Sequence, residues 1–129
     1  MKIPTDLKYT KNDEWIRVEG NLGVVGITDF AQEQLSDIVY VEIVVAQDDA
    51  VKQGDACATI ESVKAAADVY LPVSGTIVEV NEELPSKPEV VNTDPFGEAW
   101  MIKIEISEPA ELDALLTASQ YEALIQSKA

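Results

Sequence analysis

Although 47% of its 129 residues are hydrophobic, the chain carries 24 acidic against 9 basic side chains and a net charge of −15. The hydrophobic content predicts one globular domain with its own core, whereas the charge argues against nucleic acid or an anionic membrane surface as a partner. No histidine is present, so the commonest catalytic base and metal ligand are missing, and we expect neither an enzyme nor a metal site.

The sequence carries no signal for a membrane or for export. No apolar run is long enough to span a bilayer, and Met1–Pro4 does not resemble the start of a signal or transit peptide. We therefore expect a cytoplasmic protein, although the mature form of an organellar protein would have the same features. The single cysteine, Cys57, cannot form an internal disulfide and is expected to be a small core residue.

Alternation of apolar and polar residues predicts a chain rich in short strands. The pattern places strands at residues 14–18, 22–27, 38–45, 56–60, 68–71, 76–80 and 100–106. In the last strand, Trp100 and Ile102 are expected to share one face, with Met101 on the other. Segments 51–55 and 73–76, which both lead into strands, look distantly alike and suggest a weak internal repeat.

Two helical signals lie between the predicted strands. Asp29 is predicted to cap a short helix that ends at Leu35, with Gln32 completing a capping box. The acidic and proline-rich segment 81–97 is expected to be a connection with one helical turn near Glu89. These helices are therefore expected to be peripheral.

The period of the sequence changes after the last strand. Leu112 and Leu116 lie at helical spacing behind Pro109, whose missing N–H is tolerated in a first helical turn. Ser119 and Glu122 then predict a second capping box that opens a final short helix. We expect the leucine stripe of this region to pack on the sheet.

Lys64 is nearly alone among basic residues in the middle of the chain, since only Lys52 joins it between Arg17 and Lys87. It falls between two predicted strands, at the expected tip of a tight hairpin, and small alanines follow it. A flexible stem and an unhindered primary amine suit covalent attachment of an acyl group. A solvated surface lysine is the alternative that this local pattern leaves open.

A resemblance to a known family centres on this lysine. It lies in the run Glu61-Ser62-Val63-Lys64-Ala65-Ala66, followed by Pro72-Val73-Ser74-Gly75, which resembles the lipoylation site of the glycine cleavage system H-protein family. Lipoyl carriers generally have a glutamate three residues before the modified lysine and a glycine eleven residues after it, where Glu61 and Gly75 stand here. Further stretches match the family in the expected order at residues 9–15, 25–29, 38–42, 92–97 and 111–124.

The resemblance implies an all-β fold, a barrel-sandwich hybrid of two antiparallel sheets like those of lipoyl and biotinyl domains. Short peripheral helices and a C-terminal helical segment would surround the sheets. It implies a single domain over residues 1–129, with a core of roughly 22–106 and C-terminal helices of roughly 109–126. Lys64 would lie at one end of the sheets, with Glu61 and Gly75 recognised by the lipoate-attaching enzyme.

The resemblance also implies a carrier in glycine catabolism and one-carbon metabolism that has no catalytic residue of its own. Lipoate would be attached covalently to Lys64 as a swinging arm. The arm would take an aminomethyl group from the pyridoxal-phosphate-dependent glycine decarboxylase to the folate-dependent aminomethyltransferase, and dihydrolipoyl dehydrogenase would then reoxidise it. We expect the carrier to be a monomer.

Members of this family hold the loaded arm in a cleft of their own surface, where carboxylates would bind its ammonium. Glu14 and Asp68 match the family's acidic positions and are the candidates for this cleft; ordinary solvation at a strand start and a strand end is the alternative. The chain departs from the family at three nearby positions. Asp13 stands where a histidine is usual, Gln34 lies in a stretch that often carries another, and Ser36 replaces a common glycine.

Two other readings compete with this one. Biotinyl carriers usually have methionine on both sides of the lysine, whereas Val63 and Ala65 flank Lys64 here, and lipoyl domains of oxo-acid dehydrogenases usually have aspartate where Val63 stands. An H-protein-like carrier that serves in lipoate relay or regulation, rather than in glycine catabolism, would have the same attachment site. The sequence leaves this second alternative open.

Overall fold

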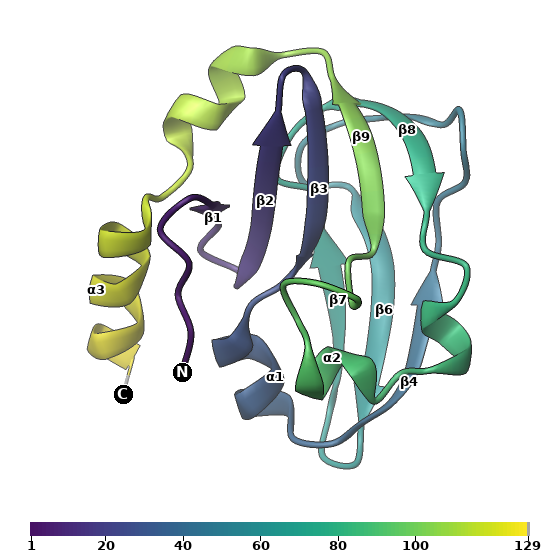
Figure 1. Cartoon of the computed structure of the whole chain (residues 1–129), viewed down its shortest axis with the longest axis vertical. Coiled ribbons are helices and arrows are strands. Elements are labelled where there is room, and N and C mark those ends of the chain that lie inside the picture. The colour runs from purple at the N-terminus through teal and green to yellow at the C-terminus, as the bar shows by residue number, and fades with distance from the viewer. Residues whose placement is uncertain (129) are drawn as a thin grey trace.

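The computed structural model describes residues 1–128; Ala129, the last residue of the expected domain, lies outside the described residues. Two antiparallel sheets and a few short helices form the fold, which confirms the expected all-β class (Figure 1). The strands are β1 (Lys8–Tyr9), β2 (Glu14–Glu19), β3 (Leu22–Ile27), β4 (Ile38–Ile43), β5 (Ala50–Val51), β6 (Ala56–Ser62), β7 (Ala66–Tyr70), β8 (Gly75–Val80) and β9 (Ile102–Ile106).

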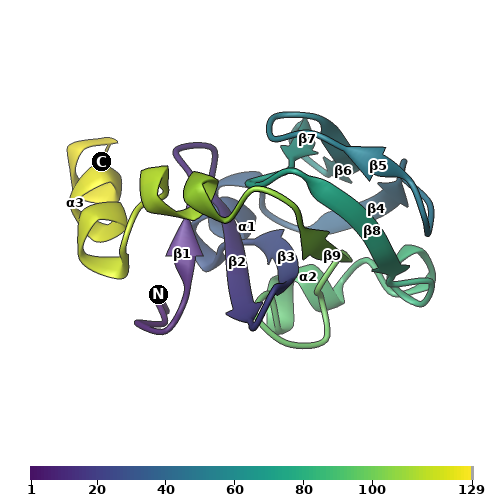
Figure 2. The ribbon, with the colours of Figure 1, turned by 90° about the horizontal axis from the view of Figure 1, so that it is seen from above.

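The larger sheet has the strand order β1-β2-β3-β9-β8-β5, and the smaller has the order β4-β6-β7. Seen from above, β4, β6 and β7 form a layer separate from β2, β3 and β9 (Figure 2). The buried faces of the two sheets supply one main core, in which Cys57 is fully buried as expected. Burial of these alternating apolar side chains is the dominant stabilising term for such a sandwich.

A second core joins the C-terminal helix α3 (Ala118–Lys128) to the outer face of the larger sheet. Tyr121 of α3 stacks on Tyr9 of β1, with ring centroids 4.6 Å apart and planes 3° apart, and Trp15 packs in the same cluster. Both described ends of the chain lie on this side of the molecule, away from β4, β6 and β7 (Figures 1 and 2). No helix within residues 1–128 combines the length and the apolar character needed to cross a membrane.

The first helix, α1 (Asp29–Leu35), begins where expected but with a different cap. The cap is Thr28, not Asp29: Thr28 has extended backbone angles and its hydroxyl accepts a hydrogen bond from the Ala31 amide at 3.1 Å. Asp29 is already helical, and its carboxylate accepts from the Gln32 side chain at 2.6 Å. Two adjacent residues could both cap, and the backbone angles decide between them.

The connection after β8 contains a 3₁₀ turn, η1 (Leu84–Ser86), and the helical turn α2 (Val90–Thr93), which Glu89 precedes as predicted. The expected shared face of Trp100 and Ile102 is wrong, because Ile102 is buried in the main core together with Met101. The strand β9 begins only at Ile102, so Met101 is fully buried in the main core and Trp100 packs in the second core. The predicted strand at 38–45 is also shorter and ends at Ile43.

The C-terminal region is less regular than its leucine spacing predicts. A 3₁₀ segment, η2 (Pro109–Ala114), ends before Leu116, which instead pairs with Tyr9 through two backbone hydrogen bonds of 2.9 and 2.8 Å. The final helix has its capping box at Thr117 and Gln120, not at Ser119 and Glu122. The bridge to β1 fixes where the chain can turn into the helix, and this pairing is not visible in the local spacing.

Candidate functional site

Lys64 lies at the tip of the hairpin that joins β6 to β7, as predicted. The turn is closed by a 2.7 Å bond from the Ser62 amide to the Ala65 carbonyl. The Ser62 hydroxyl accepts from the amides of Lys64 and Ala65 at 3.1 and 2.9 Å. One serine therefore fixes the turn from within, and the lysine side chain takes no part in holding it.

The lysine ammonium is exposed and has no carboxylate within salt-bridge distance among residues 1–128. Its Nζ lies 3.5 Å from the backbone carbonyl of Gln34, near the end of α1. The neighbouring Val63 amide donates to the Asp37 carbonyl at 3.0 Å, which ties the hairpin to the segment after α1. The Val63 side chain is 68% exposed, so the tip presents apolar surface as well as the amine.

A hollow of about 180 Å³ lies between α1, β7 and the turn before β2. We call it the Glu14 hollow; it is lined by Asn12, Asp13, Glu14, Ile27, Ala31, Gln34, Leu35, Ile60, Ala67, Asp68 and Val69. It contains both predicted cleft residues, Glu14 and Asp68, although they are far apart in the sequence. It also contains Gln34, whose carbonyl is the group nearest to the Lys64 ammonium.

Glu14 is buried, with 1% of its surface exposed, and is therefore not solvated at the start of β2. Its carboxylate accepts a hydrogen bond from the Thr10 hydroxyl and another from the Tyr70 amide at 3.1 Å. No cation pairs with it among the described residues. Burial raises the pKa of Glu14 to about 7, while these two hydrogen bonds oppose the rise. A cation bound beside this carboxyl group would favour its ionised form and lower its pKa.

The remaining predicted residues have different surroundings. Asp68 is exposed on β7 and accepts from the Thr59 hydroxyl at 3.3 Å, so it lies on the rim of the hollow. Glu61 is exposed on β6. Gly75 opens β8, at the opposite end of the molecule from the hairpin tip (Figure 1). The structure therefore brings Glu14 and Asp68 together near Lys64 but leaves Gly75 apart.

Gly75 has a packing reason of its own. A Cβ atom at this position would overlap the carbonyl oxygen of Glu105, on the neighbouring strand β9. Only glycine fits at this position without a backbone shift, because the two backbones approach closely.

The Glu14 hollow suits a flexible chain with a positive end. Its walls are apolar at Ile27, Leu35 and Val69, and Glu14 is a buried acidic residue of its lining. Sequence alternation predicted these apolar residues as strand or helix faces but gave no sign that they border a hollow. Asn12 and Thr10 were missed entirely, because only the fold of the turn before β2 bonds Thr10 to Glu14 and places Asn12 in the lining of the hollow.

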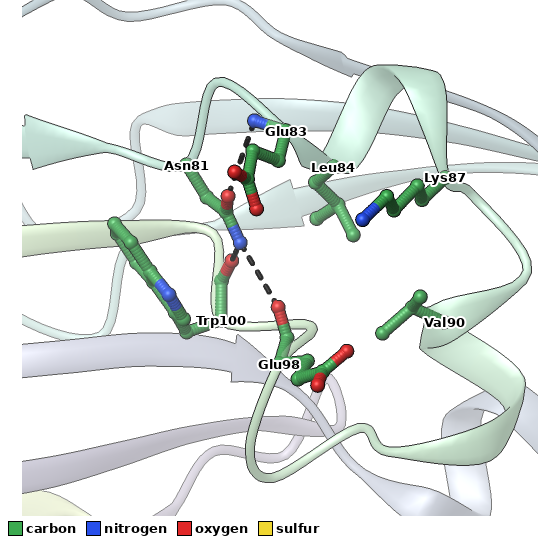
Figure 3. Close-up of a pocket in the computed structure, with 7 residues that line it drawn as sticks. All are labelled: Asn81, Glu83, Leu84, Lys87, Val90, Glu98 and Trp100. Carbon is green, nitrogen blue, oxygen red and sulfur yellow. Dashed lines mark hydrogen bonds between the residues drawn. The ribbon is translucent and has the colours of Figure 1, made fainter.

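A second hollow, of about 240 Å³, lies at the other end of β8 and contains none of the predicted residues. Figure 3 shows the charged ends of Glu83, Lys87 and Glu98 directed toward its centre. The Asn81 side chain closes one wall by donating to the carbonyls of Glu98 and Trp100 at 3.0 and 2.7 Å. Its three charged side chains are exposed, so this hollow lacks the buried charge that marks the first.

Comparisons with known proteins agree on one family. The family model for the glycine cleavage H-protein matches residues 7–128. A glycine cleavage system H protein from Carboxydothermus hydrogenoformans is 53% identical over 126 residues, covering 98% of this chain and 96% of that protein. Another, from Symbiobacterium thermophilum, is 54% identical over 121 residues and covers 94% of each chain.

The fold gives the same answer. The crystal structure of a glycine cleavage system H protein from Mycobacterium marinum superposes with a TM-score of 0.85 at 35% identity, covering 98% of this chain and 99% of that one. Sequence relatives and fold agree over nearly the whole chain, so the resemblance is not confined to the segment around Lys64. The chain therefore belongs to the glycine cleavage H-protein family.

Proposed function

We propose that this chain is the lipoyl carrier of the glycine cleavage system and that Lys64 is its attachment site. The observation that carries the proposal is the placing of one unpaired, exposed lysine at a hairpin tip beside a hollow with a buried carboxylate. Bound there, lipoate supplies a dithiol that can carry an aminomethyl group and then be reoxidised. The protein itself supplies presentation of the amine and a place to hold the loaded arm.

Presentation depends on the hairpin. The turn at 62–65 is held by backbone and Ser62 bonds, so acylating the Lys64 amine removes no structural contact apart from the weak approach to the Gln34 carbonyl. The attaching enzyme then needs access only to the tip and to Glu61 next to it. The same exposure lets glycine decarboxylase, the aminomethyltransferase and dihydrolipoyl dehydrogenase reach the arm in turn. Tethering raises the local concentration of the bound group at each of them.

Retention of the loaded arm depends on the Glu14 hollow. A loaded arm ends in an ammonium, and a buried carboxylate without a cation binds such a group through a charge-assisted hydrogen bond. The cation in turn favours the ionised form of Glu14, whose pKa is raised to about 7, mainly by burial. Asp68 on the rim adds a second negative charge, and the apolar walls accept the hydrocarbon part of the arm.

The first test is intact-mass spectrometry with peptide mapping of the protein from its native source. A mass increment of one lipoyl group on Lys64, absent from a Lys64→Arg variant of equal thermal stability, is the expected result. Arginine keeps the positive charge but cannot be acylated at physiological pH, so it is a matched control. An unmodified Lys64 in cells that lipoylate other proteins would contradict the proposal.

The second test separates glycine cleavage from lipoate relay or regulation, the alternative with the same attachment site. Lipoylated protein is added to glycine decarboxylase, aminomethyltransferase and dihydrolipoyl dehydrogenase with tetrahydrofolate and NAD⁺, and glycine-dependent NADH formation is followed. We expect turnover that is lost in the Lys64→Arg variant. Full lipoylation without turnover would favour the relay.

The third test addresses the hollow. Glu14→Gln combined with Asp68→Asn removes both charges while keeping the shapes of the side chains. We expect the loaded arm to release formaldehyde and ammonia faster than in the wild type, at unchanged lipoylation of Lys64. Equal release rates would show that the hollow does not protect the arm.

A further inference from the structure

A chain of side-chain hydrogen bonds links helix α3 to both walls of the Glu14 hollow. The Tyr121 hydroxyl donates to the Asp13 carboxylate at 2.8 Å and lies 2.6 Å from the Thr28 hydroxyl. Because the phenol proton goes to Asp13, the Thr28 hydroxyl must donate to the phenol oxygen. Thr28 in turn accepts from the Ala31 amide at 3.1 Å. Every bond in the chain therefore runs in one direction, from α1 through Tyr121 to Asp13.

The two ends of this series of hydrogen bonds belong to segments on opposite sides of the hollow. Asp13 belongs to the turn that carries Glu14, and Thr28 caps α1, which supplies Ala31 and Gln34 to the opposite wall. A backbone bond of 3.0 Å from the Thr28 amide to the Asp13 carbonyl joins the same two segments. Tyr121 does not line the hollow itself. Its hydroxyl contacts the two segments that border the hollow, on the side away from the hollow.

Among the described side chains, Tyr121 alone bonds to both Asp13 and Thr28. Tyr121 and Thr28 are each 1% exposed, so no bulk water competes for their hydroxyls. Burial raises the pKa of Tyr121 well above its usual range, and the phenol therefore remains a hydrogen-bond donor. Within residues 1–128, the only ion pair of Asp13 is with Lys128, whose Nζ lies 3.5 Å away at the exposed end of α3.

The backbone at Asp13 departs from the commonest conformations. Its φ of +67° is in the left-handed region, which aspartate tolerates better than most residues but which still costs free energy for a residue other than glycine. The next residue is Glu14, whose carboxylate must keep its place between Thr10 and Tyr70. A shift of the Asp13 turn would therefore move the charged end of the hollow.

We propose that Tyr121 is a positioning residue, whose hydroxyl holds the Asp13 turn and the start of α1 at the separation that retains the loaded arm. This inference rests on the proposed function, because it assigns Tyr121 to the same hollow. If Tyr121 has this role, the C-terminal helix α3 contributes to the arm-binding site through the hydroxyl of one residue of the second core.

The test compares Tyr121→Phe with Tyr9→Phe. Both variants keep the stacked pair of rings, and each loses one buried hydroxyl. The Tyr9 hydroxyl donates to the Pro4 carbonyl at 2.6 Å and contacts neither Asp13 nor Thr28, so this variant controls for stability alone. Thr28→Ser, which keeps the hydroxyl and the cap, should behave like the wild type.

Two readouts are needed. In the unmodified protein, hydrogen exchange of the Thr28 and Ala31 amides should be roughly tenfold faster in Tyr121→Phe than in Tyr9→Phe, the factor expected for losing a hydrogen bond to a charged group. In the loaded protein, release of formaldehyde and ammonia should be faster by a similar factor. Lipoylation of Lys64 should be equal in both variants, because the hairpin is not involved.

The opposite results are distinguishable. Unchanged exchange at these amides in Tyr121→Phe would overturn the inference. So would faster exchange with unchanged release, if Glu14→Gln accelerates release in the same assay; the proposed function would then stand without Tyr121. If neither Tyr121→Phe nor Glu14→Gln changes release, the hollow does not retain the arm, and both the protective role and this inference fail.

Discussion

The hairpin that carries Lys64 and the turn that carries Glu14 are held in opposite ways. The hairpin tip is exposed, and its few bonds are local, except for the Val63 bond to Asp37 and the long contact of Lys64 with the Gln34 carbonyl. Glu14 is buried and is bonded to a residue of β7 that is 56 positions away in the sequence. Presentation of a tethered group needs only a simple accessible turn, whereas recognition of its charged end needs a fixed and desolvated position. Under the proposed function, the molecule keeps these two requirements in separate segments.

The largest expected effect concerns Gly75, which lies in β8 of the larger sheet and, like Glu14, is held by a contact with a distant segment. Gly75→Ala should lower the free energy of unfolding by about 3 kcal/mol, because the added Cβ would overlap the Glu105 carbonyl and the backbone must shift. Chemical denaturation measures this loss. Gly54→Ala, which has open space around its Cβ but a φ of +91°, is the control and should lose only about 1 kcal/mol. A fully stable Gly75→Ala protein that is not lipoylated would instead make Gly75 a recognition residue.

The second effect concerns the pH dependence that buried Glu14 imposes. Because its pKa is raised from 4.5 to about 7, the folded state holds a proton that the unfolded state releases. The associated stability is complete below pH 4.5 and is lost as the pH rises to about 7. Glu14→Gln should therefore unfold with a free energy less sensitive to pH, and it should gain on the order of 2–3 kcal/mol on the wild type between pH 5 and pH 8.

Urea denaturation of both proteins at these two pH values measures this difference. The difference between the two proteins is the informative quantity, because the other carboxyl groups titrate in both. Parallel pH profiles would mean that the turn before β2 opens readily to water and that the comparison with the hairpin is wrong.

The third effect is a gain in stability at the turn between α1 and β4, beside the hairpin. Ser36 has φ +67° and ψ −154°, a conformation that is almost restricted to glycine. Ser36→Gly, the residue common in the family, should raise the free energy of unfolding by about 1 kcal/mol. Thermal denaturation can measure the gain. Ser36→Ala keeps the strain without the hydroxyl and should show none; an equal gain in both variants would exclude backbone strain as the cause.

The smallest effect on stability is expected in the hairpin itself. Ser62→Ala removes the acceptor of the Lys64 and Ala65 amides, but both residues are exposed and water can replace the hydroxyl. We expect a change of less than about 0.5 kcal/mol in the free energy of unfolding, together with faster hydrogen exchange of these two amides. A large global loss would show that the hairpin is tied to the core more firmly than its contacts indicate.

The sequence predicted the strands well, because one buried face gives each strand a regular alternation. It failed where two equivalent signals stand side by side. Thr28 and Asp29 can both cap a helix, and Thr117 with Gln120 competes with Ser119 and Glu122. Backbone angles and the bridge between Tyr9 and Leu116 decide these cases, and neither is a local property of the sequence.

The candidate site also has parts that could be predicted from local sequence and parts that could not. The prediction that Lys64 lies at a hairpin tip needed only the residues on either side of it. That Glu14 and Asp68 border one hollow depends on how β2 packs near β7, and here the family resemblance supplied what the residues alone did not. The hydroxyl of Tyr121 meets Asp13 from 108 positions away. No spacing rule connects residues at that distance, so this contact was not predicted.

The position of the two chain ends has a practical consequence. Both described ends lie on the side of α3, away from the layer formed by β4, β6 and β7 (Figures 1 and 2). A fusion partner, a purification tag or a solid support joined at either end would begin beside segments that border the Glu14 hollow, because the Lys2 amide donates to Asp29 of α1 and Lys128 pairs with Asp13. A flexible linker at either end should therefore be used to keep the attached body clear of the hollow and of the hairpin that carries Lys64.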